Sequence, residues 1–437
     1  MNLLGEPGVG LPGGPGKAVP SHADIQGARG RVWGVLIVLV LLMIGRVVDW
    51  YESQDVFTGA RGSFPAAFAA GGPVAPEHVV RRTSDEHALV HGLFLQDTAF
   101  GVRAVDLRSG KEYWRYERRD AKEVSWDFEV SDRTVVVGHG DGRLVGIDVR
   151  TGRLLWRVEI GEDGYRSVEL AGGQVVTGAP GAVRAFGERD GRSLWTVKMP
   201  ESCPEVLAYS VHALPDHLSV VHAMCDVASL ERDAYNLLLG VDNRTGKVLW
   251  RQRTVDPKQT AWGDGHTLVA PDPDRTQHVP LLDMNRQGIS RRAALPADGW
   301  DVVAAGSGIV VSGTDPKDGS EDHDTLLHAY GTRDGQSSWR LRAPAGQEYG
   351  FPQIADGRVY VVRQPFLTEG EAGRRIHADL LVLDADTGRL LHTLRLPSMA
   401  TLDDDDYFEK LDVLDVADGA VSIGWRDGAG DLLIATD

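Results

Sequence analysis

Asp148-Val-Arg-Thr-Gly152-Arg-Leu-Leu-Trp156 is the clearest copy of a nine-residue pattern that recurs along this chain. The pattern is Asp, two variable residues, Thr or Ser, Gly, three variable residues and Trp. With one His in the last place and two shortened copies, it returns at 106–114, 242–250, 384–392, 190–195 and 334–339. Self-similarity on a scale of about 20–50 residues is typical of stacked identical units. The repeat therefore predicts a fold assembled from copies of one small unit.

Each copy of the repeat predicts a β-hairpin. Apolar residues 144–147 precede the second copy, and the mostly apolar run 154–160 follows its polar turn. Gly152 supplies the positive φ that such a turn needs, and the Asp and Thr side chains can bond the turn backbone. The Trp falls on the outgoing strand, where a large ring can fill the space between neighbouring sheets. We expect this structural docking role for Trp114, Trp156, Trp195, Trp250 and Trp339.

A second series of turns alternates with the first. Examples are Ala171–Gln174, Ala355–Arg358 and Ala417–Ala420, each between short apolar runs. Every unit therefore has two hairpins, hence four strands. The repeat glycines stand at 110, 152, 191, 246, 288, 335 and 388, which is 39 to 55 residues apart. Four strands per unit of that length predict an all-β fold, a β-propeller of four-stranded blades.

The end of the chain predicts how the ring closes. A last hairpin turn at Ala417–Ala420 is followed by the apolar run 432–435, and the chain stops at Asp437, where the repeat Asp would stand. An eighth blade thus lacks its outermost strand, and an open edge of that kind invites aggregation. We expect Glu77–Thr83 to supply the missing strand, which makes eight blades in total.

The N-terminal region differs from the repeats. Residues 1–31 are rich in Gly and Pro and are predicted to be a disordered cytoplasmic tail. Residues 32–48 are apolar and predict one transmembrane signal-anchor helix, with a cleaved signal peptide as the alternative. Basic residues precede this segment and acidic ones follow it, which places the propeller on the extracytoplasmic side of the cell membrane. Residues 49–75 are expected to be a flexible linker, and 76–437 the propeller.

Charge and cysteine content limit the partners and the redox state. The net charge of −17 argues against binding to nucleic acid. The two cysteines, Cys203 and Cys225, flank a predicted hairpin that turns near residue 215. Antiparallel pairing would bring them close together at its open end, and an extracytoplasmic location would let a disulfide persist. Two independent thiols are the alternative.

No cluster of residues predicts catalysis or metal binding. Nucleophile-elbow, zinc-protease and phosphate-loop motifs are absent. His212, His217 and His222 follow at steps of five, but odd steps place strand residues on opposite faces. The acidic runs 318–324 and 403–406 are interpreted as solvated loops, with Ca²⁺ binding as the alternative for the first.

The repeat Asp-x-x-Thr-Gly-x-x-Leu-Trp resembles the tryptophan-docking repeat of the quinoprotein-like, or pyrroloquinoline quinone (PQQ)-like, β-propeller family, over roughly residues 76–437. One branch of that family contains PQQ-dependent dehydrogenases; another contains cofactor-free propellers, including an outer-membrane-protein assembly component. The enzyme branch typically carries a disulfide between adjacent cysteines, which Cys203 and Cys225 are not. The fifth repeat has Arg292 where Trp is expected. The resemblance therefore implies the non-enzymatic branch, with no cofactor.

Two classes of function follow from this interpretation. The first is a membrane-tethered extracytoplasmic scaffold that binds an unidentified protein or cell-envelope polymer, using the long connections 226–236, 315–325 and 365–378 on one rim. The second is an oxidoreductase that uses PQQ and Ca²⁺. Sugar or polymer binding in the central channel is a variant of the first class.

Overall fold

The computed structural model describes residues 55–68, 76–83, 87–119, 125–161, 168–179, 181–200, 207–225, 235–254, 261–262, 267–269, 278–296, 302–313, 325–367, 374–401, 410–425 and 431–436. The chain divides into two units, Met1–Gln54 and Asp55–Asp437, and all described residues belong to the second. The tail predicted at 1–31 and the transmembrane helix predicted at 32–48 lie outside the described residues. In the described part of the chain, no helix has the length and apolar character needed to cross a membrane.

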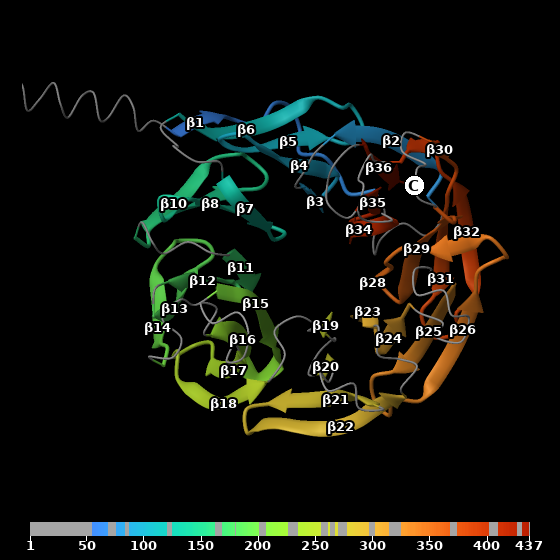
Figure 1. Cartoon of the computed structure of the whole chain (residues 1–437). Coiled ribbons are helices and arrows are strands. Elements are labelled where there is room, and N and C mark those ends of the chain that lie inside the picture. The colour runs from blue at the N-terminus through green and yellow to red at the C-terminus, as the bar shows by residue number, and fades with distance from the viewer. Residues whose placement is uncertain are drawn as a thin grey trace, which may run out of the picture. The chain divides into compact units, whose positions relative to one another are not determined.

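The described strands form eight antiparallel sheets of four or five strands, numbered here 1 to 8 in chain order, and one sheet of two strands. The eight sheets follow one another around a ring (Figure 1). Sheet 1 contains β1 (Asp55–Thr58), β3 (His87–Val90), β4 (Leu93–Thr98), β5 (Gly101–Asp106) and β6 (Glu112–Arg118). Sheet 2 contains β7 (Ser125–Val130), β8 (Thr134–His139), β9 (Arg143–Asp148) and β10 (Leu154–Glu159). Sheet 3 contains β11 (Val168–Ala171), β12 (Gln174–Ala179), β13 (Ala182–Gly187) and β14 (Ser193–Lys198). Sheet 4 contains β15 (Leu207–Leu214), β16 (Leu218–Cys225), β17 (Tyr235–Asp242) and β18 (Val248–Thr254).

The second half of the chain repeats this arrangement. Sheet 5 contains β19 (Ala261–Trp262), β20 (Thr267–Val269), β21 (His278–Asn285) and β22 (Gly288–Pro296). Sheet 6 contains β23 (Val302–Gly306), β24 (Ile309–Ser312), β25 (Leu326–Gly331) and β26 (Ser337–Arg342). Sheet 7 contains β27 (Gln347–Tyr349), β28 (Gln353–Ala355), β29 (Arg358–Pro365), β31 (Asp379–Asp384) and β32 (Leu390–Arg395). Sheet 8 contains β2 (His78–Thr83), β34 (Leu411–Ala417), β35 (Ala420–Trp425) and β36 (Asp431–Thr436). The two-stranded sheet pairs β30 (Arg375–Ile376) with β33 (Met399–Ala400), and a short 3-10 helix, η1 (Pro215–His217), joins β15 to β16.

Sheet 8 joins the two ends of the described chain. Strand β2 pairs antiparallel with β36, with Val80 opposite Ile434. The amide of Glu77 extends this ladder by donating to the carbonyl oxygen of Thr436 at 3.0 Å. The expectation that Glu77–Thr83 supplies the outer strand of the last sheet is confirmed.

Hydrophobic clusters fill the seams between neighbouring sheets. Among the described residues there are eight such clusters, and each draws its buried side chains mainly from two adjacent sheets. The cluster between sheets 1 and 2 contains Trp114 and Tyr116, both fully buried. The cluster between sheets 8 and 1 contains Ile434 and Phe94. Because both faces of each sheet are covered, a strand such as β8 is buried along its whole length.

The polypeptide before β2 differs from the expected flexible linker at 49–75. Strand β1 adds a fifth strand to the outer edge of sheet 1, with Val56 opposite Glu117. Residues 59–68, here called the strap, then continue from β1 towards β2. Sheet 1 is therefore broader than the four-stranded unit that the repeat predicts. The other residues of 49–75 lie outside the described part.

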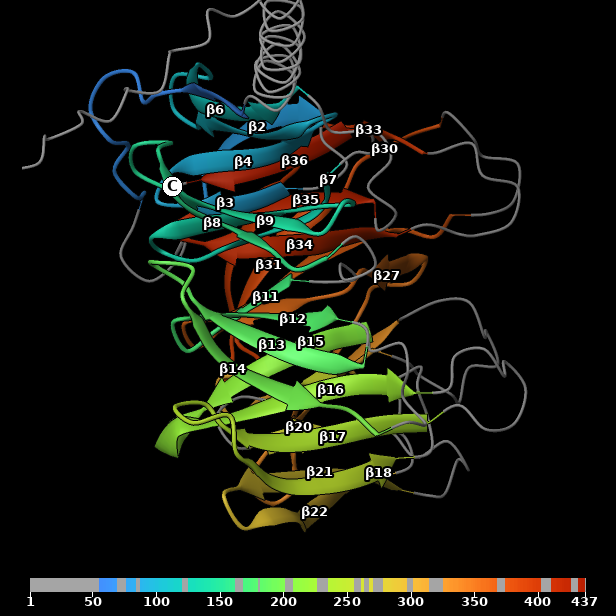
Figure 2. The same cartoon turned by 90° about the vertical axis from the view of Figure 1, so that its left-hand side faces the viewer.

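In an antiparallel four-stranded meander, the turns after the first and third strands lie at the same end of the sheet. We call the surface that carries these turns in all the sheets the turn face. Viewed from the side, the hairpin turns of successive sheets are arranged along one edge of the ring (Figure 2). The strap and the two cavities described below lie on this face.

Candidate functional site

The five repeat tryptophans connect neighbouring sheets. Each indole Nε1 donates a hydrogen bond to a main-chain carbonyl oxygen in the turn of the following sheet. The donors Trp114, Trp156, Trp195, Trp250 and Trp339 meet Val149, Glu188, Asn243, Asn285 and Ala385 at 2.7, 2.7, 3.2, 2.8 and 2.7 Å. Four of the rings are at most 7% exposed, and that of Trp250 is half-buried. Rings held in this way between sheets are not arranged for stacking on a ligand.

The repeat glycine takes part in the same contact between neighbouring sheets. Gly152 has φ +63°, and a Cβ at this position would lie 2.5 Å from the Cβ of Trp114. The same close approach occurs between Gly246 and Trp195. The glycine thus serves both the left-handed turn and the close packing of the preceding tryptophan.

At two positions the repeat Trp is replaced, and the contact between neighbouring sheets changes. Arg292, in the place of the fifth Trp, bonds within its own sheet to Asp283 and to Thr267 Oγ1. No side chain of that position therefore bridges sheets 5 and 6. His392, in the place of the seventh Trp, keeps the bridge, because its Nε2 lies 3.1 Å from the carbonyl oxygen of Pro76, next to the closing strand β2.

The predicted disulfide lies largely outside the described residues. Cys203 is not among them, and for Cys225 only the main chain is described, at the end of β16. The observed hairpin pairs Leu207 with Met224, which is close to the register assumed from the sequence. The Cys203–Cys225 bond therefore stays a prediction.

The other candidate ligands do not form a metal site where they can be described. His222 is buried, whereas His217 is exposed in the turn between β15 and β16. The side chain of His212 and the acidic runs 318–324 and 403–406 lie outside the described part. Within the described part, no three His, Cys, Asp or Glu side chains gather in a way that could hold a metal ion.

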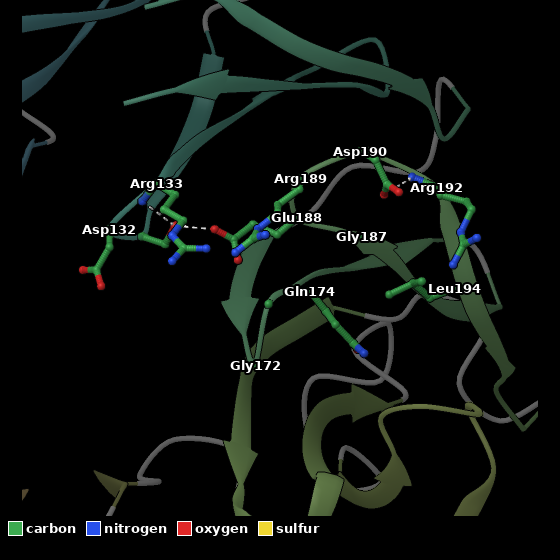
Figure 3. A pocket seen from close by; sticks show the side chains of 12 residues that line it. Asp132, Arg133, Gly172, Gln174, Gly187, Glu188, Arg189, Asp190, Arg192 and Leu194 are labelled. Carbon is green, nitrogen blue, oxygen red and sulfur yellow. Dashed lines mark hydrogen bonds between the residues drawn. The ribbon is translucent and has the colours of Figure 1, made fainter. Parts of the chain in front are cut away.

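Two adjoining cavities open on the turn face, between sheets 1, 2 and 3. The larger, of 680 Å³, lies between the β7–β8 turn and the turns of sheet 3 (Figure 3). The second, of 530 Å³, extends towards sheet 1. The two cavities share Asp132, Arg133 and Arg189. The sequence did not single out these residues, because the turns that carry them resemble those of the other repeats.

Three of the four arginines that border these cavities are available for a ligand. The side chains of Arg133, Arg189 and Arg192 are exposed, and none makes a hydrogen bond or ion pair in the described part of the chain. Glu188, by contrast, is engaged as the acceptor of a hydrogen bond from Ser131 Oγ, which joins sheet 3 to sheet 2. The site thus offers unpaired guanidinium groups against a fixed rim.

A buried polar cluster fixes β1 at the seam between sheets 1 and 2. The Asp55 carboxylate is fully buried and lies 2.6 Å from Nη2 of Arg157 in sheet 2. Its other oxygen accepts a hydrogen bond from the Tyr116 hydroxyl at 3.2 Å. That hydroxyl also lies 2.9 Å from Nε2 of His139. Burial, followed by the charge of Asp55, raises the pKa of Tyr116 well above its ordinary value. Tyr116 therefore stays protonated, and the cluster is structural.

Titratable groups also meet where the last sheet closes on the first. Nε2 of His87 lies 2.9 Å from Oγ of Ser422, and the Leu89 amide donates to Asp415 at 2.9 Å. Burial lowers the pKa of His87 to about 4 and raises that of Asp415. Both groups therefore favour their neutral forms inside this seam.

Comparisons with known proteins point to one repeat family. The family model described as outer membrane protein assembly factor BamB matches residues 99–273 and 236–404. BamB of Nitrosomonas eutropha is 30% identical over 148 residues, which cover 34% of this chain and 32% of that protein. The 1-butanol dehydrogenase (cytochrome c) of Thauera butanivorans is 36% identical over 103 residues, covering 20% and 15%. The matches thus span a third or less of these relatives.

Solved structures that align with part of this chain include proteins of the same two kinds. BamB of Moraxella catarrhalis aligns with a TM-score of 0.46 and 13% identity, over 83% of this chain and 99% of that one. The quinohemoprotein alcohol dehydrogenase of Comamonas testosteroni aligns with a TM-score of 0.46 and 13% identity, over 87% and 76%.

Proposed function

The chain belongs to the PQQ-like repeat family that the model of outer membrane protein assembly factor BamB describes, and from this premise we propose that it is a non-catalytic, protein-binding β-propeller of the cell envelope. The observation that carries the proposal is the pair of adjoining cavities on the turn face, bordered by Arg133, Arg189 and Arg192, whose side chains make no hydrogen bond or ion pair in the described part of the chain. Planar cations on a rigid rim are suited to recognition of another polypeptide.

The wider architecture belongs to the same proposal. The eight sheets are taken as the complete set of blades, with sheet 8 closing the ring. Residues 32–48 form a single-pass signal-anchor helix, residues 1–31 lie in the cytoplasm, and the propeller lies outside the cell membrane. Support comes from the charge difference across the apolar segment. Protease treatment of intact spheroplasts should degrade the propeller and leave an N-terminal tag on residues 1–31 protected; protection of the propeller would contradict this topology.

The partner is proposed to be an envelope protein, because the family description names a factor in outer-membrane protein assembly. A photo-cross-linking amino acid at Arg192, beside the larger cavity, tests this in cells that produce the full chain. We expect one discrete adduct with an extracytoplasmic protein. Arg251, exposed on the outer strand β18 of sheet 4, is the matched control position. If the cross-linker at Arg192 gives no defined product that is missing at Arg251, the turn face is not the binding surface.

A second candidate function has one observation in its favour. Several relatives are alcohol dehydrogenases, including 1-butanol dehydrogenase (cytochrome c) and 1-butanol dehydrogenase (quinone) of Thauera butanivorans. In this alternative the propeller would bind PQQ with Ca²⁺ and oxidise an alcohol. Reduction of a dye by the purified chain with PQQ, Ca²⁺ and 1-butanol would support it and contradict the non-catalytic proposal. No dye reduction above the protein-free rate is the result that we expect.

A further inference from the structure

The strap shows how the turn face holds an extended peptide. After β1, the amide of Ala60 donates to the carbonyl oxygen of Thr151 at 3.1 Å. The amide of Arg61 donates to the carbonyl oxygen of Tyr113 at 2.9 Å. These acceptors belong to sheets 2 and 1, so the strap crosses the seam between them. Near its end, the Phe68 amide donates to the carbonyl oxygen of Asp418 in sheet 8 at 3.0 Å.

Two aromatic side chains anchor the strap, and each lies against an arginine. Cζ of Arg150 is 4.2 Å from the centroid of the Phe64 ring. Cζ of Arg108 is 3.9 Å from the centroid of the Phe68 ring. Both distances are within the range of a cation–π contact. Arg108 also donates to the main-chain carbonyl oxygens of Ala66 and Ala67, the latter at 3.1 Å.

These two arginines occupy the same place in successive repeats. Arg108 and Arg150 each stand two residues after the repeat Asp, and Arg189 holds this place in the third repeat. Arg189 borders both cavities and, in the described part of the chain, has neither an aromatic ring nor a carboxylate as partner. The first two members of the series are occupied by the chain's own phenylalanines, whereas the third is open.

The surface beside Arg189 is uncovered in a way that fits this comparison. Leu155 precedes Trp156 as Tyr113 precedes Trp114, and it borders the smaller cavity. Tyr113, beneath the strap, is 4% exposed, whereas Leu155 is 40% exposed. An apolar side chain left open beside an unpaired arginine is what a missing aromatic anchor would cover.

We propose that Arg189 and Leu155 receive an aromatic side chain from an extended segment of the partner protein, which binds beside the strap and in the same manner. This inference rests on the proposed protein-binding function and names the chemistry of the partner. The carbonyl oxygen of Leu155 corresponds to that of Tyr113 and is the acceptor for one partner amide. The partner's ring lies on the guanidinium plane of Arg189.

The test uses a fluorescent peptide with the sequence of residues 58–68 as the probe, added to the full chain, with binding measured by anisotropy. We expect saturable one-to-one binding that Arg189→Gln weakens by about fivefold or more, because a cation–π contact at a half-open site has that order of strength. A peptide with Ala in place of both phenylalanines should not bind. Arg244→Gln is the matched control, because Arg244 holds the same place in the fourth repeat and borders neither cavity.

Three results would overturn the inference. The first is unchanged affinity in Arg189→Gln, and the second is no saturation at about 1 mM peptide, the weak limit of specific binding. The third is loss of binding when Arg150 is the only residue replaced by Gln, because the peptide would then be taking the place of the strap. If any of these occurs while cross-linking at Arg192 still yields its discrete adduct, protein binding stands and only the aromatic anchor is wrong.

Discussion

Trp114 in sheet 1 donates a hydrogen bond from its indole nitrogen to the carbonyl oxygen of Val149 in sheet 2, at 2.7 Å. The ring is fully buried, so this bond forms away from water and is not exchanged for a bond to solvent. The same bond recurs at four other seams. The repeat therefore attaches each of the five sheets that carry its Trp to the following sheet.

Gly152→Ala should destabilise the protein by about 2–4 kcal/mol, because it adds a strained left-handed residue and a Cβ that collides with Trp114. Gly357→Ala is the control: it has φ +72° but no atom within 4 Å of the added Cβ. Strain alone predicts a loss of about 1 kcal/mol there. Chemical unfolding measures both changes. Equal losses in the two variants would show that the contact with Trp114 contributes nothing.

The seam between sheets 5 and 6 should open more readily than the others, because Arg292 replaces the bridging tryptophan. Amides of β21 and β22 are expected to exchange hydrogen for deuterium faster than those of β8 and β9. Peptide-resolved exchange followed by mass spectrometry provides the measurement. If β21 and β22 are as protected as β8 and β9, the hydrogen bond from the repeat tryptophan to the next sheet is not needed to keep the seam closed.

Stability should fall as the pH falls from 6.5 to 4, in part because of His87. Its pKa is lowered from 6.5 to about 4 in the folded protein, so the unfolded chain takes up protons first in that window. The full effect is about 3 kcal/mol, at 1.36 kcal/mol per pKa unit. Above pH 6.5 the contribution of His87 is constant.

His87→Gln isolates this effect, because Gln can bond to Ser422 but does not titrate. The difference in unfolding free energy between the two proteins should change across pH 6.5 to 4 and be flat above it. Asp415 acts in the opposite direction. Because its pKa is raised in the folded protein, its contribution to the stability of the protein decreases as the pH rises past 3.8. It is present in both proteins and cancels in the comparison. A flat difference down to pH 4 would contradict the role of His87.

Asp55→Asn should loosen β1 without unfolding the ring. The substitution removes the ion pair with Arg157 but leaves an acceptor for Tyr116. We expect a loss of about 1–3 kcal/mol, at the low end because Arg157 is half-exposed and can turn to water. Amide exchange in 55–58 and 115–118 should increase more than in β8 and β9. A uniform increase over all sheets would indicate that β1 is integral to the ring.

The repeat predicted the sheets because each turn carries its own signal. Asp, Gly and Trp at fixed places specify the hairpin and its contact with the next sheet, whatever the variable positions hold. The closing strand was predictable for a related reason: a sheet that ends on an unpaired edge needs a partner, and Glu77–Thr83 lies directly before the first repeat unit. His392 shows the limit, because its bond to Pro76 joins residues that no local pattern connects.

The strap was not predictable by the same reasoning. Residues 55–68 are rich in Gly, Ala and Pro, which is the composition of a linker. Their order depends on Asp55, Phe64 and Phe68 meeting partners from distant parts of the chain. The one local signal is the spacing of aromatic residues within a stretch otherwise composed of small ones. The cavities beside Arg189 arise from what the strap leaves uncovered, so no motif could have shown them.

The pairing of β2 with β36 determines when sheet 8 can be completed during biosynthesis. Strand β2 ends at Thr83 and its partner begins at Asp431, so at about 10 residues per second β2 waits roughly half a minute for its neighbour to be made. Until then sheet 8 lacks β36, and β2 has no strand to pair with. A ribosome that stops early would release an incomplete ring with two open edges, which proteases and chaperones can recognise. Completion of sheet 8 therefore depends on residues 431–436, which form the last of the described strands to be synthesised.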